Sequence, residues 1–386
     1  MSSLSPRLEK FVAGRPDTPV VAIDLDIVEE RYLALAAALP GVSLFYAVKA
    51  NPAPEILSLL RSLGCRFDVA SSGEIALCRD LGAEGDEISF GNTIKHRDAV
   101  AEAHQLGITR FSVDCGAELD KVHAAAPGSL VSARISCDGA GASWPLSGKF
   151  GCSPSDAVEL LIRAADLGHR LGVSFHVGSQ QLRTGAWDVA LIEVAAMADD
   201  LARRGLVFDE VNLGGGFPAS LGDGAPAIDE YGAAIMSAVE HRIGGLDARL
   251  AAEPGRYLVA DAGALVSEVL LVSQRSVGDS TRWVYLDVGV FTGLVEAIGE
   301  AVRYPITCDR SSEDTLPSIL AGPTCDSLDV IYEQHPVALP AELAEGDRLV
   351  FAGTGAYTTT YSAVAFNGFA PLRQVVLSDP ASSSGS

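Results

Sequence analysis

The chain has 386 residues and 48% of them are hydrophobic, which is typical of a globular α/β protein and excludes a fibrous or disordered chain. Its formal net charge of −22 makes nucleic acid and anionic membranes unfavourable partners and would attract a cationic small substrate, although solubility alone also explains such acidity. At this length we expect two domains rather than one small core.

The sequence shows no signal for a membrane or an oxidising compartment. No apolar run approaches the roughly 20 residues that span a bilayer. The first residues, MSSLSPRLEKF, lack the apolar core of a signal peptide. The seven cysteines are odd in number and lack CxxC spacing, so we expect reduced thiols, no metal site and a cytoplasmic protein.

The first half of the chain alternates between strand and helix patterns. Residues 1–17 predict a helical turn and a linker, and a strand over 18–26 precedes the helical segment IVEERYLALAAAL. The eight strands predicted next are VSLFYAV, RFDVAS (66–71), EISFGN (87–92), TRFSVD (109–114), VSARISC (131–137), GVSFHVGS (172–179), FDEVNLGGG (208–216) and RLAAEPG (249–255). With helices between them they predict a (β/α)₈ barrel over 26–258, although alternation alone leaves a doubly wound sheet open.

Polar side chains suited to chemistry lie at or just past these strand ends. They are Lys49, Asp68, Arg134, His176, Ser179, Gly214 to Gly216 and Glu253. In a barrel such ends converge on one mouth, where active sites are built. This shared location favours the barrel over the doubly wound sheet.

The pattern changes after about residue 258. Short β-rich runs such as TRWVYLDVG, LPSILAGPT, DRLVFAG and PLRQVVLS are separated by turns. They predict a mostly antiparallel β-domain over 259–375, joined by the strand at 18–25. The low-complexity residues 376–386 are expected to be a disordered tail.

The stretch FYAVKANP (45–52) places Lys49 at the carboxyl end of a predicted buried strand. Among apolar and backbone groups its ammonium would lose solvation, and we therefore expect a free amine. Such an amine can form a Schiff base with a carbonyl compound. A surface lysine just past a strand is the alternative.

Two glycine-containing motifs are suited to phosphate. In GGGFP (214–218) the backbone amides are open to an anion, although a glycine triplet by itself more often forms a tight structural turn. In EPGRY (253–257) Gly255 offers an amide and Arg256 a guanidinium.

An acid and an imidazole complete the pattern. A carboxylate at Glu253 could keep a pyridine nitrogen protonated. HVGSQ (176–180) supplies an imidazole face, although a lone histidine there is more often a hydrogen-bonded core residue. Together an amine, an acid, a stacking face and a phosphate site match the needs of pyridoxal 5′-phosphate.

The motifs YAVKANP, HVGSQ, GGGFP, EPGRY, PTCDSLD and GAYTTTYSAVAFNGF, in this order from about residue 18 to 375, resemble those of one enzyme family. It is the group III, alanine-racemase-fold pyridoxal-phosphate decarboxylases, which act on ornithine, lysine, arginine or diaminopimelate. The resemblance implies that Lys49 holds the cofactor, Glu253 binds its ring nitrogen and His176 stacks on its face. Further cofactor contacts are implied for Asp68, Arg134, Ser179, Gly215, Gly216, Gly255, Arg256 and Tyr357.

The resemblance also implies a homodimer with active sites at its interface. Cys325 would protonate the substrate carbon after CO₂ leaves, and Asp326 would contact the distal amine of the substrate. Phe369 matches a pocket aromatic. Glu300 or Glu296 could supply a second negative group.

Within the family the chain resembles the ornithine and lysine branch, through GGGFP, the Cys325–Asp326 pair and the RYPI segment. Diaminopimelate enzymes usually have glutamate and serine where this chain has Asp326 and Tyr257. Trp144 and Pro145, in the 138–148 loop, match no pattern and leave the preferred chain length open.

The implied reaction converts L-ornithine to putrescine or L-lysine to cadaverine, with release of CO₂. A decarboxylase of diaminopimelate or another diamino acid is one alternative. An amino-acid racemase usually has arginine in place of Glu253. An inactive homologue acting as a binding protein should lack Lys49 or the Cys325–Asp326 pair.

Overall fold

The computed structural model describes residues 4–144, 148–222, 224–276, 278 and 280–378. Pro145 and residues 379–386 of the predicted tail lie outside the described residues. The first two residues of that predicted tail, 376 and 377, instead belong to the strand Arg373–Leu377. The chain forms two compact units. We call Glu29–Pro218 with Pro226–Gly255 the barrel unit, and Met1–Val28, Ala219–Ala225 and Arg256–Ser386 the β unit.

The barrel unit contains a closed barrel of parallel strands in the order β10-β11-β2-β3-β4-β5-β6-β8. The strands are β2 (Val42–Ala47), β3 (Arg66–Val69), β4 (Ile88–Phe90), β5 (Arg110–Val113), β6 (Leu130–Arg134), β8 (Arg170–Ser174), β10 (Glu210–Asn212) and β11 (Arg249–Ala252). Parallel pairing of Leu250 with Val42 joins β11 to β2 and closes the barrel. The predicted (β/α)₈ barrel is thus confirmed, and the doubly wound sheet is excluded.

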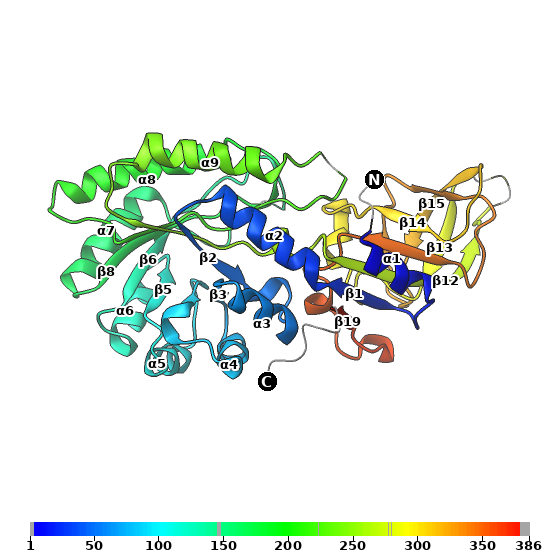
Figure 1. The fold of residues 1–386 in the computed structure, drawn as a ribbon, viewed down its shortest axis with the longest axis horizontal. Helices are drawn as coiled ribbons and strands as arrows, with labels where there is room; N and C mark the ends of the chain where they lie inside the picture. The colour runs from blue at the N-terminus through cyan, green and yellow to red at the C-terminus, as the bar shows by residue number, and fades with distance from the viewer. Residues whose placement is uncertain (1–3, 145–147, 223, 277, 279, 379–386) are drawn as a thin grey trace. The chain divides into compact units, whose positions relative to one another are not determined.

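Helices surround the barrel strands, as Figure 1 shows for α3 to α9. The helices are α2 (Leu25–Ala38), α3 (Pro54–Ser62), α4 (Ser72–Asp80), α5 (Arg97–Gln105), α6 (Gly116–Ala125), α7 (Pro154–Asp166), α8 (Ala186–Ala202) and α9 (Ile228–Ile243), with 3₁₀ turns η1 (Val48–Ala50) and η2 (Gly85–Glu87). Hydroxyl caps begin two of them, since Ser71 accepts from Glu74 N and Ser153 from Asp156 N. Among the described residues, no helix combines the length and apolar character needed to cross a bilayer.

A small antiparallel ribbon, which the sequence did not predict, lies in the barrel unit. It joins β7 (Ala142–Trp144) to β9 (Ser179–Gln181), and Trp144 pairs with Ser179. The ribbon therefore brings Trp144, in the described part of the 138–148 loop, beside Ser179, one of the predicted site residues.

The β unit is built on a nine-stranded, mostly antiparallel sheet, which confirms the second part of the predicted fold. Its strands are β1 (Val20–Asp24), β12 (Gly263–Ser273), β13 (Arg282–Leu286), β14 (Ile306–Cys308), β15 (Thr315–Ala321), β16 (Val330–Ile331), β17 (Val337–Pro340), β18 (Arg348–Ala352) and β19 (Arg373–Leu377). Its helical segments are α1 (Pro6–Ala13), α10 (Arg256–Val259), η3 (Val295–Glu300), η4 (Thr359–Tyr361) and η5 (Phe366–Gly368). Strand β1, near the amino end, lies antiparallel to β12 and parallel to β19, so both ends of the chain enter one sheet (Figure 1).

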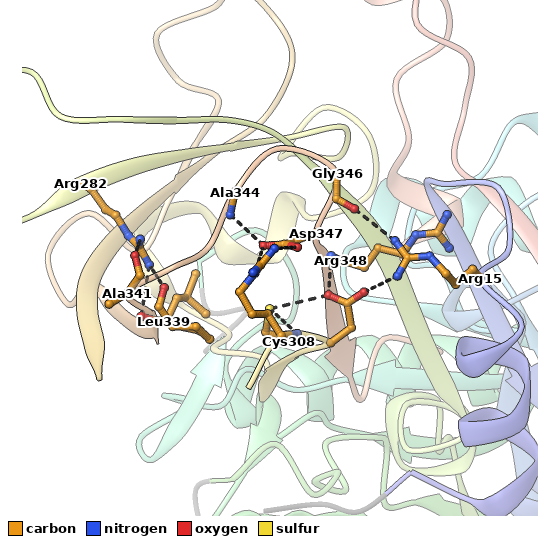
Figure 2. Close-up of polar contacts among 12 residues, drawn as sticks. Arg15, Arg282, Cys308, Leu339, Ala341, Ala344, Gly346, Asp347 and Arg348 are labelled. Carbon is orange, nitrogen blue, oxygen red and sulfur yellow. Dashed lines mark hydrogen bonds and ion pairs between the residues drawn. The ribbon is translucent and has the colours of Figure 1, made fainter. Parts of the chain in front are cut away.

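Arginines tie loops of the β unit to its sheet. Buried Arg282 on β13 donates to the carbonyl oxygens of Leu339 and Ala341, at 3.2 and 2.9 Å (Figure 2). Arg15, in the amino-terminal segment, donates to the carbonyl of Gly346 at 3.2 Å. Each contact is a hydrogen bond from a charged donor, which contributes more to stability than one between neutral groups.

Candidate active site

Five of the predicted polar residues gather at the mouth of the barrel unit. Lys49 lies in η1 after β2, Asp68 on β3, and Arg134 ends β6, while His176 and Glu253 follow β8 and β11. Electrostatic interactions connect them: Lys49 and Arg134 act on each of the other three, and Asp68 acts on Glu253. The structure thus brings two bases, two acids and an imidazole into one group.

The Lys49 ammonium is not desolvated, which makes that part of the sequence argument wrong. Its side chain is 52% exposed, and Nζ lies 3.4 Å from Oδ2 of the buried Asp68. The physical reason is that β2 ends at Ala47, so Lys49 falls in the following 3₁₀ turn rather than within the buried strand. The amine therefore lies beside a carboxylate and is partly exposed.

Burial lowers the pKa of a different lysine. Lys95 has its pKa lowered to about 8 by burial, against the opposing charge of Glu118. Its Nζ donates to the carbonyl oxygens of Asn92 at 2.8 Å and Ser112 at 2.6 Å. These contacts hold the Lys95 side chain inside the barrel unit, and we therefore assign Lys95 a structural role.

The two acids of the mouth face a common space. A Cβ atom placed on Gly91 would lie 2.1 Å from Asp68 Oδ1 and 3.4 Å from Glu253 Oε1. Burial, together with the charge of Asp68, raises the pKa of Glu253 to about 7. Burial also raises the pKa of Asp68, whose Oδ1 has no hydrogen-bond partner among the described residues. Two such carboxyls suit a cationic or N–H-bearing group between them.

His176 presents a neutral ring. Burial, followed by the charges of Arg134 and Lys49, lowers the pKa of His176 to about 3. Its Nδ1 accepts a hydrogen bond from Gly178 N at 3.0 Å, which fixes the ring plane. A neutral, oriented imidazole can stack on a flat aromatic group without charge repulsion.

The glycines of GGGFP are required by their surroundings. A Cβ on Gly214 would lie 1.8 Å from the carbonyl oxygen of Phe175. One on Gly215 would lie 2.6 Å from the carbonyl oxygen of Glu253 and 3.0 Å from His176 Nε2. The structural-turn interpretation therefore accounts for these residues, and a phosphate role for Gly215 and Gly216 stays a prediction.

Several predicted residues belong to the β unit instead. Arg256 begins α10, directly after Gly255, the last residue of the barrel unit. Its Cζ lies 5.0 Å from the ring centroid of Tyr357. Cys325 and Asp326 are exposed on one loop.

The loop that carries Cys325 and Asp326 is tied to the carboxyl-terminal FNGF motif. Cys325 N donates to Asn367 Oδ1 at 3.0 Å, and Phe366 packs on Phe291 with ring centroids 4.6 Å apart. Phe369, the last residue of this motif, is 38% exposed. The structure therefore places these predicted substrate contacts in one exposed region of the β unit.

Glu300 is occupied by contacts within the β unit. Its carboxylate accepts from the backbone N–H groups of Gln334 at 2.7 Å and His335 at 3.0 Å, and from Arg303 Nη1 at 2.6 Å. Burial alone would raise the pKa of Glu300, but the hydrogen bonds from His335 and Gln334 and the charge of Arg303 together outweigh burial and lower the pKa. Glu300 therefore has a structural explanation, and its substrate role stays a prediction.

Sequence analysis missed two polar contacts made by predicted site residues, one with Asn212 and one with Glu296. Asn212 donates from Nδ2 to Glu253 Oε1 at 2.6 Å, and its Oδ1 accepts from Gly214 N at 2.9 Å. The sequence feature that could have identified Asn212 is a single amide side chain at the end of an apolar strand. Glu296 forms an ion pair with Arg256, and the sequence had offered it only as a second negative group for substrate.

Comparisons with known proteins cover nearly the whole chain. Residues 25–260 match the family model described as pyridoxal-dependent decarboxylase, pyridoxal binding domain. Lysine/ornithine decarboxylase of Selenomonas ruminantium is 36% identical over 97% of this chain and 94% of its own length. Ornithine decarboxylase of Schizosaccharomyces pombe is 35% identical over 92% of this chain and 82% of its own.

A solved structure shows the same fold. The structure of lysine/ornithine decarboxylase from Vibrio vulnificus, complexed with cadaverine, has a TM-score of 0.87 and 31% identity to this chain. The match covers 98% of this chain and 100% of that one.

Proposed function

This chain belongs to the family of pyridoxal-dependent decarboxylases, and from that premise we propose that it decarboxylates L-lysine and L-ornithine. As a member of that family it is a carboxy-lyase that depends on pyridoxal 5′-phosphate. The products would be cadaverine, putrescine and CO₂. The observation that carries the proposal is the grouping of Lys49, Asp68 and Glu253 in one barrel mouth.

The barrel mouth fits the cofactor. Oδ1 of Asp68 is a buried acceptor that receives no hydrogen bond from the part of the chain that the structure describes. Glycines at positions 91 and 215 leave space where a Cβ would collide with Asp68, Glu253 or His176. Such a cradle suits a flat ring that carries an N–H group at one edge.

The bound cofactor supplies an electron sink for the bond that breaks when CO₂ departs. Lys49, half exposed beside Asp68, would hold the cofactor's carbonyl carbon and later take it back from product. Glu253 would keep the proton on the ring nitrogen, because its pKa of about 7 leaves it ready to ionise beside a cation. Neutral His176 would cover one ring face.

The phosphate of the cofactor needs its own set of donors. We propose for this role the set that the family resemblance implies, which is Ser179, Gly215, Gly216, Gly255, Arg256 and Tyr357. Arg134 would complete the charge balance around the ring, since it acts on Asp68, His176 and Glu253.

We further propose a homodimer in which Cys325 and Asp326 complete the site. Apolar side chains lie exposed on this loop and in the segments that follow η4 and η5: Leu328 at 54%, Val364 at 82% and Phe369 at 38%. These exposed apolar side chains support the proposal of an interaction surface in this part of the β unit. Cys325 would deliver a proton to the substrate carbon, and Asp326 would receive the distal ammonium.

The chain carries the groups that an inactive homologue should lack, namely Lys49, Cys325 and Asp326. We propose that residues 26–258 form one domain and that residues 259–375, together with residues 18–25, form the other. The cysteine usage supports a cytoplasmic location.

The proposal is tested with a substrate panel. Purified protein loaded with pyridoxal phosphate is given L-lysine, L-ornithine, L-arginine, meso-diaminopimelate and the D-forms of lysine and ornithine, and CO₂ and amines are measured. We expect CO₂ in equal amount to cadaverine or putrescine from the L-forms. CO₂ from diaminopimelate alone would move the chain to that branch, and inverted stereochemistry without CO₂ would show a racemase.

A further inference from the structure

Arg256 and Glu296 form a buried ion pair inside the β unit. Nη1 donates to Oε2 at 2.8 Å and Nη2 to Oε1 at 2.6 Å. The two side chains are only 3% and 6% exposed. Two parallel charge-assisted bonds fix the plane of the guanidinium, which a single contact would not do.

Stability is a weak reason for such a pair. Removing two charges from water costs several kcal/mol, and apolar side chains of similar size often serve a core as well or better. What the pair provides is a fixed orientation. Glu296 reaches Arg256 from η3, forty positions along the chain.

The surroundings of the pair are polar beyond what a core requires. The Tyr357 ring centroid lies 5.0 Å from Arg256 Cζ. Tyr304 Oη is buried with no hydrogen-bond partner among the described residues, and Tyr304 interacts with both members of the pair. Burial, followed by the charge of Glu296, raises the pKa of Tyr304, so its hydroxyl stays a donor. An oriented cation beside an unused donor is suited to an anion with several oxygens.

We propose that Glu296 is a positioning residue, which orients the Arg256 guanidinium so that it can bind the phosphate of the cofactor. The inference rests on the proposed function, in which Arg256 contacts that phosphate. A guanidinium carries five N–H donors, and Glu296 takes two of them. Glu296 thus acts on the phosphate through Arg256 and does not touch it.

The test compares how tightly pyridoxal 5′-phosphate and pyridoxal bind to the cofactor-free protein. Binding is measured from the visible absorbance of the bound compounds. The ratio of the two affinities is the phosphate preference. Glu296→Ala should lower this preference about 10-fold or more while changing pyridoxal affinity less than about twofold. Glu296→Gln, which keeps one acceptor oxygen, should lower it by a smaller factor.

A double-mutant cycle separates positioning from an independent effect. Arg256→Ala should lower the preference at least as far as Glu296→Ala. The double variant, which leaves no buried charge unpaired, should lower it no further than Arg256→Ala. If the double variant instead lowers the phosphate preference by the product of the two single-variant factors, Glu296 acts independently of Arg256 and the inference is overturned.

A second bidentate pair in the β unit serves as the control. Arg310 donates to Asp347, labelled in Figure 2, at 2.6 and 2.8 Å. Asp347→Ala should lower the melting temperature and leave the phosphate preference unchanged. If Glu296→Ala behaves like this control, Glu296 is merely structural and the inference fails. A wild-type protein that binds neither compound would instead overturn the proposed function.

Discussion

Replacing Glu253 with Gln should change how the stability of the cofactor-free protein depends on pH. The pKa of Glu253 is raised from 4.5 to about 7, first by burial and then by the charge of Asp68. Between these values the folded chain keeps a proton that the unfolded chain has lost, so stability falls as pH rises through this window. A full shift of this size corresponds to about 3 kcal/mol.

His176 works in the opposite direction. The pKa of His176 is lowered from 6.5 to about 3. The unfolded chain therefore binds a proton at pH values below 6.5 that the folded chain does not bind, so the stability of the folded protein falls as the pH is lowered from 6.5 toward 3. In the wild type the two trends largely cancel between pH 5 and 8. In Glu253→Gln the Glu253 trend is absent while the His176 trend remains, so the stability of the variant relative to the wild type should rise by about 2 to 3 kcal/mol from pH 5 to pH 8.

Urea unfolding of cofactor-free wild type and Glu253→Gln at pH 5 and pH 8 provides the measurement. At each pH the unfolding free energy of the wild type is subtracted from that of the variant, and the two differences are compared. Equal m-values in the two proteins show that the substitution has not changed the surface exposed on unfolding. The difference should move by about 2 to 3 kcal/mol in favour of the variant at pH 8. A difference that does not change with pH would refute the placement of Glu253 in a desolvated, acidic setting.

Three further substitutions test single contacts. Asn212→Ala removes a hydrogen bond that lowers the pKa of Glu253, so the pH window should move upward in the same urea experiment; an unmoved window would contradict it. Gly215→Ala should cost about 1 to 3 kcal/mol in thermal unfolding and weaken cofactor binding, whereas Gly185→Ala, where nothing lies within 4 Å, should do neither. Equal losses in both glycine variants would argue against a crowded cradle. Asp326→Ala should raise KM for L-lysine far more than for norleucine, which lacks the distal amine, and equal changes would remove Asp326 from that amine.

The barrel could be predicted because each of its strands is a local signal. Every predicted strand has a short apolar run, and a chemistry-bearing side chain follows most of them, as His176 follows β8 and Glu253 follows β11. Hydrophobic periodicity and turn residues depend on only a few neighbouring positions, so they can be recognised in a single sequence. The β7–β9 ribbon was missed because its strands have three residues each and no alternating apolar face.

The contacts of the site were harder to predict because they join distant positions. Asn212 and Glu253 are 41 residues apart, and Arg256 and Glu296 are 40 apart, so no local pattern marks either pair. The error at Lys49 has another cause, since one 3₁₀ turn after β2 moved its ammonium from a buried strand to an open mouth. Burial of a lysine depends on the exact residue at which a strand ends, which sequence patterns locate poorly.

The most direct test is to find which lysine holds the cofactor. The chain has five lysines, at positions 10, 49, 95, 121 and 149, so a peptide map gives one clear answer. Protein loaded with pyridoxal phosphate is reduced with borohydride, digested and analysed by mass spectrometry. The account predicts the phosphopyridoxyl group on Lys49. Modification of Lys95, whose pKa of about 8 makes it the competing amine, or of no lysine at all, would contradict it.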